Sequence, residues 1–187
     1  MGFAAPDCLK GTDLTAQQLA GNLSELPFSL EQEFSFHRNL LELNVNPMLG
    51  MLLGKAYKLE AYGLLGYAFM SAPTLRHAMI VLRNYGPLTF TFFDVNFLVE
   101  GSNGILRFSP GIPVPEDLLS YYVDRDMTAA VSGGRDSLRR PIEPIHIQLM
   151  HNGEDQREIY ERHFRCPISF SATASERYLD AGMLDEP

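Results

Sequence analysis

The chain has 187 residues, a length that suits one domain with a substantial buried core. Hydrophobic residues make up 45% of the sequence and charged residues 20%, proportions that argue against a chain disordered over its whole length. The formal net charge is −8, which argues against a protein that binds a nucleic-acid backbone without a basic partner domain.

The features that the sequence lacks indicate where the protein works. No apolar run approaches the roughly 20 residues needed to cross a bilayer, and the N-terminus has no signal-peptide pattern. Cys8 and Cys166 are far apart and form no C-x-x-C motif, so we expect reduced thiols and neither a disulfide framework nor a zinc site. We therefore expect a cytoplasmic protein with no membrane partner.

The N-terminal third contains signals for short helices. The expected helices are a short one ending at Leu19, one capped by Ser29 that covers residues 30–43, and one over residues 48–57. Glycine weakens a helix by about 1 kcal/mol relative to alanine, unless close packing excludes a side chain. Glycines on neighbouring helices, at positions 50, 54, 63 and 66, therefore indicate backbones packed close together.

Residues 62–85, YGLLGYAFMSAPTLRHAMIVLRNY, form the most apolar stretch of the chain. Leu64 to Met70 is apolar on every side, which predicts a central helix that is buried all round. Ser71 to Thr74 then interrupts the helical pattern. A second helix is expected to end at Gly86-Pro87 and to bury one stripe, made of Leu75, Ala78, Met79, Leu82 and Tyr85.

An aromatic β-ribbon is predicted after this helix. Apolar and polar residues alternate over residues 88–92, and the alternation restarts one residue out of phase at Phe93. A slip of one residue is typical of a β-bulge. Asn103-Gly104 is expected at the centre of a tight hairpin, with a return strand over residues 105–108.

The C-terminal half alternates between helices and strands. A helix from Glu116 to about Val131 is expected to end at Gly133-Gly134, before a solvated connection over residues 135–144. The remaining expected elements are a strand over 145–149, an exposed charged helix over 154–164, a last strand over 167–172 and a short helix in the tail from Ser175.

This order of elements predicts an α+β fold. A helical N-terminal half is followed by a small antiparallel or mixed β-sheet of four short strands with packed helices. The alternative is a cupin-like β-sandwich, against which the helical first half argues. We expect residues 1–187 to form a single domain.

Aromatic residues of the ribbon and of the following helix are candidates for an apolar ligand pocket. Asp126 falls within the apolar stripe of that helix, so its carboxylate must be paired or must line a cavity, because an isolated buried charge is very costly. The candidate ligand-binding residues are Phe90, Phe92, Phe97, Tyr121, Tyr122, Arg125 and Asp126. The alternative is that the aromatic residues fill the core and that Asp126 lies at the rim of a narrower stripe.

The sequence offers no candidate for catalysis or for a cofactor. His77 and His151 each lack a second ligand at a spacing that converges on a metal or haem. No G-x-S-x-G elbow and no glycine-rich phosphate loop is present. The helices joined through Ser71 to Thr74 could be taken for a helix-turn-helix, but the first is too apolar to lie on DNA and the chain is acidic. We expect no enzyme, no metal and no cofactor.

Several segments, taken in order, resemble the N-terminal effector-sensing domain of the arabinose-binding-like branch of AraC-type transcription regulators. These segments are CLKGTDL (8–14), QEFSFHRNLLEL (32–43), YGLLGYAFMSAPTL (62–75), YERHFRCPISFSA (160–172) and YLDAGMLDEP (178–187). The specificity of the resemblance lies in their order and spacing, because none is a fingerprint by itself.

The resemblance implies a regulatory domain that senses a small-molecule effector, forms a homodimer and reaches DNA through a helix-turn-helix domain expected after residue 187. Effector binding would then shift the population of domain or dimer arrangements. We expect the charged helix over 154–165 to face a partner, and the effector to be an apolar acid or a cationic amino-acid derivative. The alternatives are a stand-alone enzyme or binding protein for a hydrophobic small molecule, and a ligand-free dimerisation module.

Overall fold

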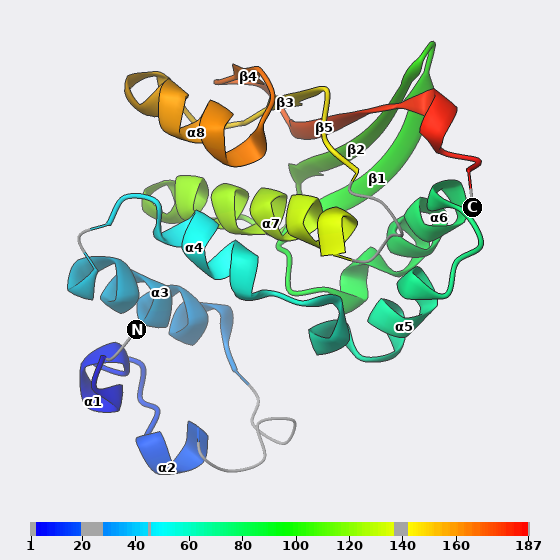
Figure 1. Cartoon of the computed structure of the whole chain (residues 1–187). Coiled ribbons are helices and arrows are strands. Elements are labelled where there is room, and N and C mark those ends of the chain that lie inside the picture. The colour runs from blue at the N-terminus through cyan, green and yellow to red at the C-terminus, as the bar shows by residue number, and fades with distance from the viewer. Residues whose placement is uncertain (1–2, 20–27, 45, 137–141, 187) are drawn as a thin grey trace.

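In the computed structural model, the long helix α7 (Glu116–Asp136) lies against one face of a five-stranded sheet, and α4 (Leu49–Ala56) packs on the opposite side of α7 (Figure 1). The structure describes residues 3–19, 28–44, 46–136 and 142–186. Within these residues, helices occupy the N-terminal half and every strand follows residue 92. The predicted α+β fold is confirmed, and the alternative β-sandwich is not the fold of this chain.

Before α4, the described residues form the helices α1 (Ala5–Cys8), α2 (Ala16–Leu19) and α3 (Leu30–Leu43). The start of α3 is fixed by a capping box. The Gln32 backbone N–H donates to Ser29 Oγ at 3.1 Å, and the Ser29 backbone N–H donates to Gln32 Oε1 at 3.0 Å. Because each residue satisfies a backbone donor of the other, the helix begins where the sequence predicts.

Helices α4 and α7 approach backbone to backbone at two glycines. A Cβ atom at Gly50 would lie 2.9 Å from the Asp124 Cβ, and one at Gly54 would lie 2.7 Å from the Thr128 Cβ. A Cβ at Gly66 would overlap the carbonyl oxygen of Leu59. The predicted close packing is confirmed at these three glycines, whereas Gly63 has open space around it and adopts a positive φ of 56° instead.

Helix α5 (Leu64–Met70) packs against α6 (Leu75–Tyr85) at the edge of the molecule (Figure 1). The prediction that α5 is buried all round is wrong, since Leu64 is 89% exposed and Tyr67 60% exposed. Only one face of this seven-residue helix packs against the rest of the protein, and that face carries the buried Leu65 and Phe69. On α6, the inner part of the predicted stripe is buried, namely Leu75, Ala78 and Met79.

The predicted ribbon forms from β1 (Phe93–Glu100) and β2 (Asn103–Pro110), but its details differ from the prediction. Glu100 pairs with Asn103, so the turn is Gly101-Ser102 and the Asn-Gly pair already belongs to β2. Gly101 has a φ of 58°, a conformation that glycine adopts without strain. The predicted β-bulge is wrong: residues 88–92 are not a strand, and the change of phase at Phe93 marks where β1 begins.

Helix α7 continues through Gly133-Gly134, so the predicted end at these glycines is wrong. The physical reason is packing, because a Cβ at Gly134 would lie 3.0 Å from two nitrogens of the Arg177 guanidinium. The glycine makes room for a buried arginine and does not stop the helix. The predicted connection over residues 135–144 lies partly outside the described residues, and Arg135 belongs to α7.

The C-terminal half supplies the rest of the sheet. Its elements are β3 (His146–Gln148), η4 (Glu154–Gln156), α8 (Arg157–Phe164), β4 (Ile168–Ser169), β5 (Ser175–Asp180) and η5 (Ala181–Met183). The sheet order is β1-β2-β5-β3-β4, with β3 and β4 parallel and the other pairs antiparallel. The predicted count of four strands is one too low.

The predicted tail helix starts at Ser175, but residues 175–180 form the central strand β5 and, among the described residues, only the short 3-10 helix η5 follows it. Charged side chains hide the strand in the sequence. Glu176 is buried with Arg107, Gln148 and Tyr178 as hydrogen-bond partners. Arg177 is buried on the opposite face, where it donates to the carbonyl oxygens of Ala130 and Ile142.

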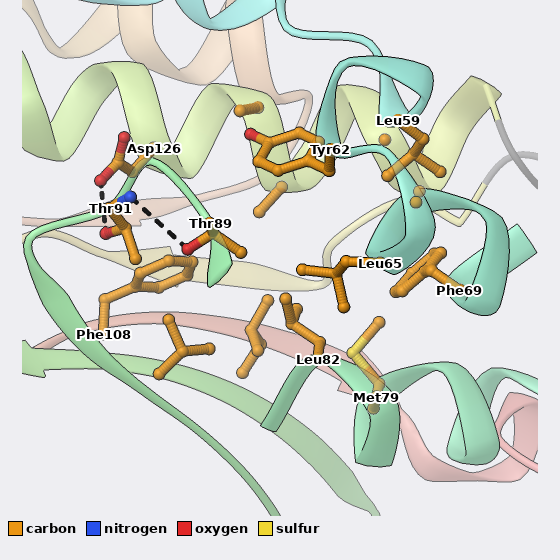
Figure 2. Close-up of a pocket in the computed structure, with 17 residues that line it drawn as sticks. Leu59, Tyr62, Leu65, Phe69, Met79, Leu82, Thr89, Thr91, Phe108 and Asp126 are labelled. Carbon is orange, nitrogen blue, oxygen red and sulfur yellow. Dashed lines mark hydrogen bonds between the residues drawn. The ribbon is translucent and has the colours of Figure 1, made fainter. Parts of the chain in front are cut away.

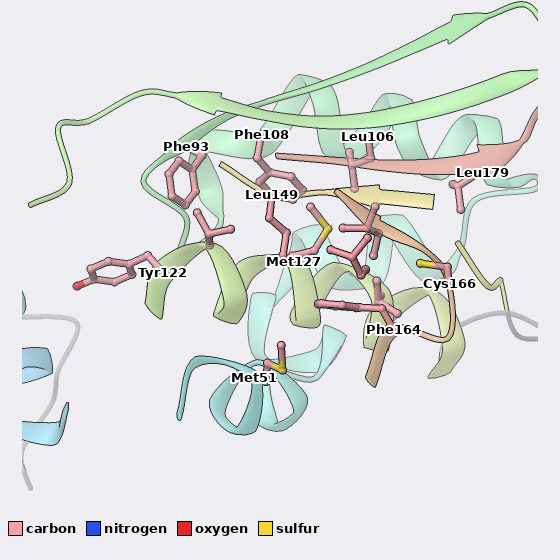
Figure 3. Packing of buried hydrophobic residues seen from close by; sticks show 14 of the residues in the cluster. Met51, Phe93, Leu106, Phe108, Tyr122, Met127, Leu149, Phe164, Cys166 and Leu179 are labelled. Carbon is pink, nitrogen blue, oxygen red and sulfur yellow. The ribbon is translucent and has the colours of Figure 1, made fainter. Parts of the chain in front are cut away.

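The core lies between the sheet and α7 and extends to α8 (Figure 3). Met127 of α7 is surrounded by side chains from the sheet side, including Phe108 and Leu149 (Figure 3). The charged helix α8 is exposed on one side only, because Tyr160 and Phe164 are buried in this core. Among the described residues, no helix is long and apolar enough to span a bilayer.

Candidate functional site

A cavity of about 80 Å³ lies between the β1–β2 ribbon and α7, and α5, α6 and η2 (Leu59–Tyr62) close its other sides (Figure 2). Ten of its lining residues are apolar, namely Leu59, Leu65, Phe69, Met79, Leu82, Val95, Leu106, Phe108, Ala129 and Ala130. The other lining residues are Tyr62, Gly66, Thr89, Thr91, Asp126, Gly133 and Gly134. The cavity is partly open to the surface.

The polar side chains of the lining gather at one end of the cavity, as Figure 2 shows. Thr91 Oγ1 donates to Asp126 Oδ2 at 2.6 Å, and Arg125 Nε donates to Asp126 Oδ1 at 2.7 Å. Tyr62 points its hydroxyl toward the same end (Figure 2). The Asp126 carboxylate is therefore both paired and exposed to a cavity, the two situations in which a buried charge on this helix is tolerated.

Arg125 holds Asp126 from behind the cavity wall. Its Nη2 donates to the Phe90 carbonyl oxygen at 2.7 Å, and its guanidinium lies 4.7 Å from the centre of the Tyr122 ring. Burial raises the pKa of Asp126, and the adjacent guanidinium opposes this shift. Arginine stays charged in proteins, and Arg125 Nε and Asp126 Oδ1 form a buried salt bridge at 2.7 Å.

The two threonine hydroxyls at the polar end already donate hydrogen bonds within the protein. Thr91 donates to Asp126 and accepts from the Phe93 backbone N–H at 3.2 Å, while Thr89 donates to the Gly86 carbonyl oxygen at 2.6 Å. Burial raises the pKa of Tyr62 to about 12, with the nearby Asp126 charge as the next cause, so this phenol stays protonated. The polar end therefore offers carboxylate oxygens as acceptors and one phenolic hydroxyl.

The structure brings only Asp126, of the seven predicted ligand-binding residues, into the lining of the cavity. Phe90 is 49% exposed, between the rings of Tyr57 and Tyr62. Phe92, Tyr121 and Tyr122 pack with Phe34 and His37 of α3 in an aromatic cluster, and Phe97 is buried in β1. Arg125 contacts Asp126 but does not line the cavity.

The sequence predicted a pocket between the ribbon and α7, and both line this cavity, but seven of its seventeen lining residues come from α5, α6 and η2, which the prediction did not include. The stripe of α6 contained a usable signal, since Met79 and Leu82 both line the cavity. That α5 turns Leu65 and Phe69 toward this stripe is a tertiary fact with no local signal in the sequence.

The aromatic cluster beside α3 is a packed part of the core with one polar bond. His37 Nδ1 lies 2.6 Å from the Tyr122 hydroxyl. Burial, reinforced by the Arg125 charge, lowers the pKa of His37 to about 4, so the imidazole is neutral near pH 7. Glu33 lies near Arg125 from the α3 side, and burial raises its pKa.

A second buried polar group joins α7 to the C-terminal half. Asp124 Oδ1 lies 2.9 Å from His151 Nε2, and Asp124 Oδ2 accepts from the Tyr160 hydroxyl at 2.9 Å. Burial raises the pKa of Asp124. Burial by itself would lower the pKa of His151, but the hydrogen bond to Asp124, the charge of that carboxylate and the bond to the Asn152 carbonyl oxygen together raise it. None of the three residues lines the cavity, so the group ties the core together away from the candidate site.

The described residues contain no group of three or more histidine, cysteine, aspartate or glutamate side chains placed to hold a metal ion. Cys8 and Cys166 are both buried free thiols. Burial raises the pKa of Cys166 to about 11, which keeps it as an unreactive thiol near pH 7.

Comparisons with known proteins identify the relatives of this fold. A family model described as the arabinose-binding domain of AraC transcription regulators, N-terminal, matches residues 2–187. Two curated proteins, one from Mycobacterium bovis and one from Mycobacterium tuberculosis, are each described as an uncharacterized HTH-type transcriptional regulator. Each is 24% identical to this chain over 191 residues, and the match covers 100% of this chain and 55% of the relative.

Among solved structures, the crystal structure of the transcriptional regulator CdpR from Pseudomonas aeruginosa matches with a TM-score of 0.69 and 22% identity. The match covers 87% of this chain and 52% of that protein, and it shows the shared fold. The chain thus spans about half the length of the relatives it matches.

Proposed function

This chain belongs to the family of N-terminal arabinose-binding domains of AraC transcription regulators, and we propose that the cavity described above is where it senses its effector. The chain is a ligand-sensing regulatory domain. In our proposal a helix-turn-helix domain follows residue 187 and carries the DNA-binding activity, since the curated relatives are HTH-type regulators of about twice this length. The protein works in the cytoplasm and transforms no substrate.

The observation that supports this proposal is that α6 connects the cavity to the end of the described chain. Met79 and Leu82 line the cavity from α6. At the start of the same helix, the Arg76 backbone N–H donates to the Leu184 carbonyl oxygen at 2.8 Å, and the Arg76 guanidinium donates to both carboxylate oxygens of Asp185 at 2.7 and 2.8 Å.

An effector that enters between α5 and α6 would favour positions of α6 that make room for it. Since Arg76 holds residues 184 and 185, a shift of α6 moves the segment that follows β5. A ligand changes an equilibrium only by binding one state better than the other. The two states in this proposal are therefore two positions of α6, and the effector selects one of them.

The residues predicted from sequence to bind ligand take different parts in this proposal. Asp126 contacts the effector, and Arg125 positions the Asp126 carboxylate from behind the wall. The aromatic residues act indirectly by supporting Arg125 and the ribbon, and they are Phe90, Phe92, Phe97, Tyr121 and Tyr122.

We also propose that the domain forms a homodimer through α8. Its outer side carries exposed charged residues around Ile159, which is 44% exposed. Sedimentation velocity of the chain tests this surface. A dimer that Ile159→Lys dissociates supports it, and a dimer that this variant leaves intact places the interface elsewhere.

A thermal-shift panel tests the sensing role. Amino acids, sugars, fatty acids and neutral aromatic compounds are added to the chain at millimolar concentration, and a compound that binds the folded state raises the melting temperature. At least one class is expected to do so. If every compound leaves the melting temperature unchanged, the sensing role in this cavity is wrong.

The variant Arg76→Ala tests the connection through α6 in the longer polypeptide that includes the DNA-binding domain. The effector found in the panel should still bind this variant, while the transcriptional response to it is lost. The matched control is Arg38→Ala, which removes a similar exposed pair with Asp117 at 2.6 Å, far from α6. An equal response in both variants would show that α6 does not transmit the signal.

A further inference from the structure

The cavity lining restricts the chemistry of a ligand that can bind there. This inference rests on the proposed function, because it takes the cavity to be the effector site. Ten of the lining residues are apolar, and the polar ones lie together at one end. Such an arrangement suits a molecule with an apolar body and a single polar group. A pentose places a hydroxyl on nearly every carbon, and most of those hydroxyls would face leucine, phenylalanine or methionine side chains. An unpaired buried hydroxyl costs about 1–3 kcal/mol, so a sugar fits this lining poorly.

The hydrogen-bonding state of the polar end determines which polar group fits. The Asp126 carboxylate has about four acceptor positions, and the bonds from Arg125 and Thr91 use two of them. The hydroxyl protons of Thr89 and Thr91 are already committed to acceptors of the protein. The polar end therefore has unused acceptor positions on Asp126 and one further hydroxyl, that of Tyr62, so it favours a ligand group that donates a hydrogen bond to Asp126 and can also accept one, as a hydroxyl does.

Charge discriminates further between possible ligand groups. A ligand carboxylate at the polar end would lie beside the Asp126 carboxylate, and the Arg125 Nε and Nη2 groups are bonded to Asp126 and to the Phe90 carbonyl oxygen. A ligand ammonium would share Asp126 with Arg125 and would be buried among apolar side chains, which is costly for a charged group. A neutral hydroxyl gains the bond to the carboxylate without either cost.

The size of the cavity sets the scale of the ligand. A cavity of about 80 Å³ has room for several water molecules, whereas an empty cavity of about 150 Å³ holds a benzene ring. The cavity is partly open, and one of its walls is the short helix α5, whose outer residues Leu64 and Tyr67 are exposed. A single ring therefore fits after a small outward movement of α5.

We propose that the effector is a neutral, mostly apolar molecule of about one ring in size whose single hydroxyl donates a hydrogen bond to Asp126. Its apolar body lies against Leu65, Met79 and Leu82. Because α5 packs against α6, the outward movement of α5 that admits the ring also changes the position of α6, which is the change that the proposed function requires.

Five probes of similar size test the chemical class by calorimetry on the chain at pH 7: phenol, anisole, benzoate, benzylammonium and L-arabinose. Phenol is expected to bind most tightly. Anisole keeps the ring and lacks the donor, so it should bind about tenfold more weakly, as expected for one lost hydrogen bond of about 1.5 kcal/mol. Equal affinities for phenol and anisole would overturn the role of the hydroxyl.

Tighter binding of benzoate, benzylammonium or L-arabinose than of phenol would overturn the proposed class, while the sensing role would stand because the domain still binds a small molecule. Binding of none of the five probes would also overturn the class. The wider thermal-shift panel then decides separately whether the domain senses anything.

Two variants of α7 locate the binding site. Ala129→Leu adds a side chain that fills the cavity, and leucine is a good helix former, so phenol binding should fall at least tenfold. Ser120→Leu adds leucine at an exposed position of the same helix away from the cavity and should leave phenol binding unchanged. Equal phenol affinity in both variants would overturn the location.

A second measurement on the wild-type chain keeps the location testable if Ala129→Leu fails to fold. With ¹³C-methyl-labelled methionine, phenol should shift the NMR signal of Met79, which lines the cavity. The signal of Met51, buried between α4 and α7, should not shift. A phenol-induced shift at Met51 and none at Met79 would overturn the proposal.

Discussion

Replacing Gly54 with alanine should destabilise the domain, although alanine is the better helix former. The new methyl group would overlap the Arg125 carbonyl oxygen and lie 2.7 Å from the Thr128 Cβ, so α4 and α7 would have to separate. Neither obstacle is the mobile end of a side chain. Overpacking of this kind typically costs about 1–3 kcal/mol, and the gain in helix propensity returns about 1 kcal/mol.

Subtracting the propensity gain from the overpacking cost leaves a net loss of about 0–2 kcal/mol in the free energy of unfolding, and we expect about 2 kcal/mol for Gly54→Ala because a rigid backbone carbonyl is displaced. For a domain of this size such a loss corresponds to a fall of about 4–8 °C in the melting temperature. Urea denaturation followed by far-UV circular dichroism measures it, which suits a chain without tryptophan.

The matched control is Gly133→Ala, on α7. There the new Cβ would lie 3.4 Å from the Leu59 Cδ2, an ordinary contact with a flexible side chain. This variant should be as stable as the wild type or more stable, by up to about 1 kcal/mol. If Gly54→Ala is no less stable than Gly133→Ala, the close approach of α4 and α7 is not what stabilises this pair of helices.

Three further predictions concern charge and backbone conformation. Because burial lowers the pKa of His37 to about 4, its neutral form contributes stability above pH 6.5 that is lost as the pH falls toward 4. The variant His37→Gln should therefore reduce the acid-induced fall in unfolding free energy by roughly 1.4 kcal/mol per pH unit below 6.5. An unchanged slope would contradict this. Asp124→Asn, in the buried group with His151, should cost about 2 kcal/mol, whereas Asp117→Asn, in an exposed pair, should cost under about 1 kcal/mol in the same urea assay. Gly101→Val should lower the melting temperature more than Gly101→Asn, since asparagine tolerates a positive φ and a branched residue does not, and equal melting temperatures would refute the turn assignment.

Local signals predicted the elements whose ends are fixed by neighbouring residues. The capping box of Ser29 and Gln32 fixed the start of α3, and the glycines of α4 indicated the contact with α7 before the partner was known. Asp126 could be singled out because a carboxylate within an apolar stripe requires a partner or a cavity, and it has both.

Sequence patterns failed where burial depends on distant partners. Glu176 and Arg177 lie in the segment predicted as a tail helix, yet both are buried in β5 because Arg107, Gln148 and backbone carbonyls reach them from other elements. Leu64 is predicted to be a core residue, yet it is 89% exposed because, among the described residues, none covers the outer side of α5. The lining of the cavity could not be predicted for the same reason, since its walls come from segments separated by up to 75 positions, from Leu59 to Gly134.

The position of β5 governs the order in which this domain can be completed during synthesis. Without residues 175–180 the sheet separates into two fragments, β1–β2 and β3–β4, because β5 alone joins them. Each fragment then presents a bare edge that can recruit strands from other nascent chains. The ribosome must therefore translate residues 175–180 before the five strands can form one sheet, and a stop codon just before Ser175 would remove the middle of the sheet, not its border.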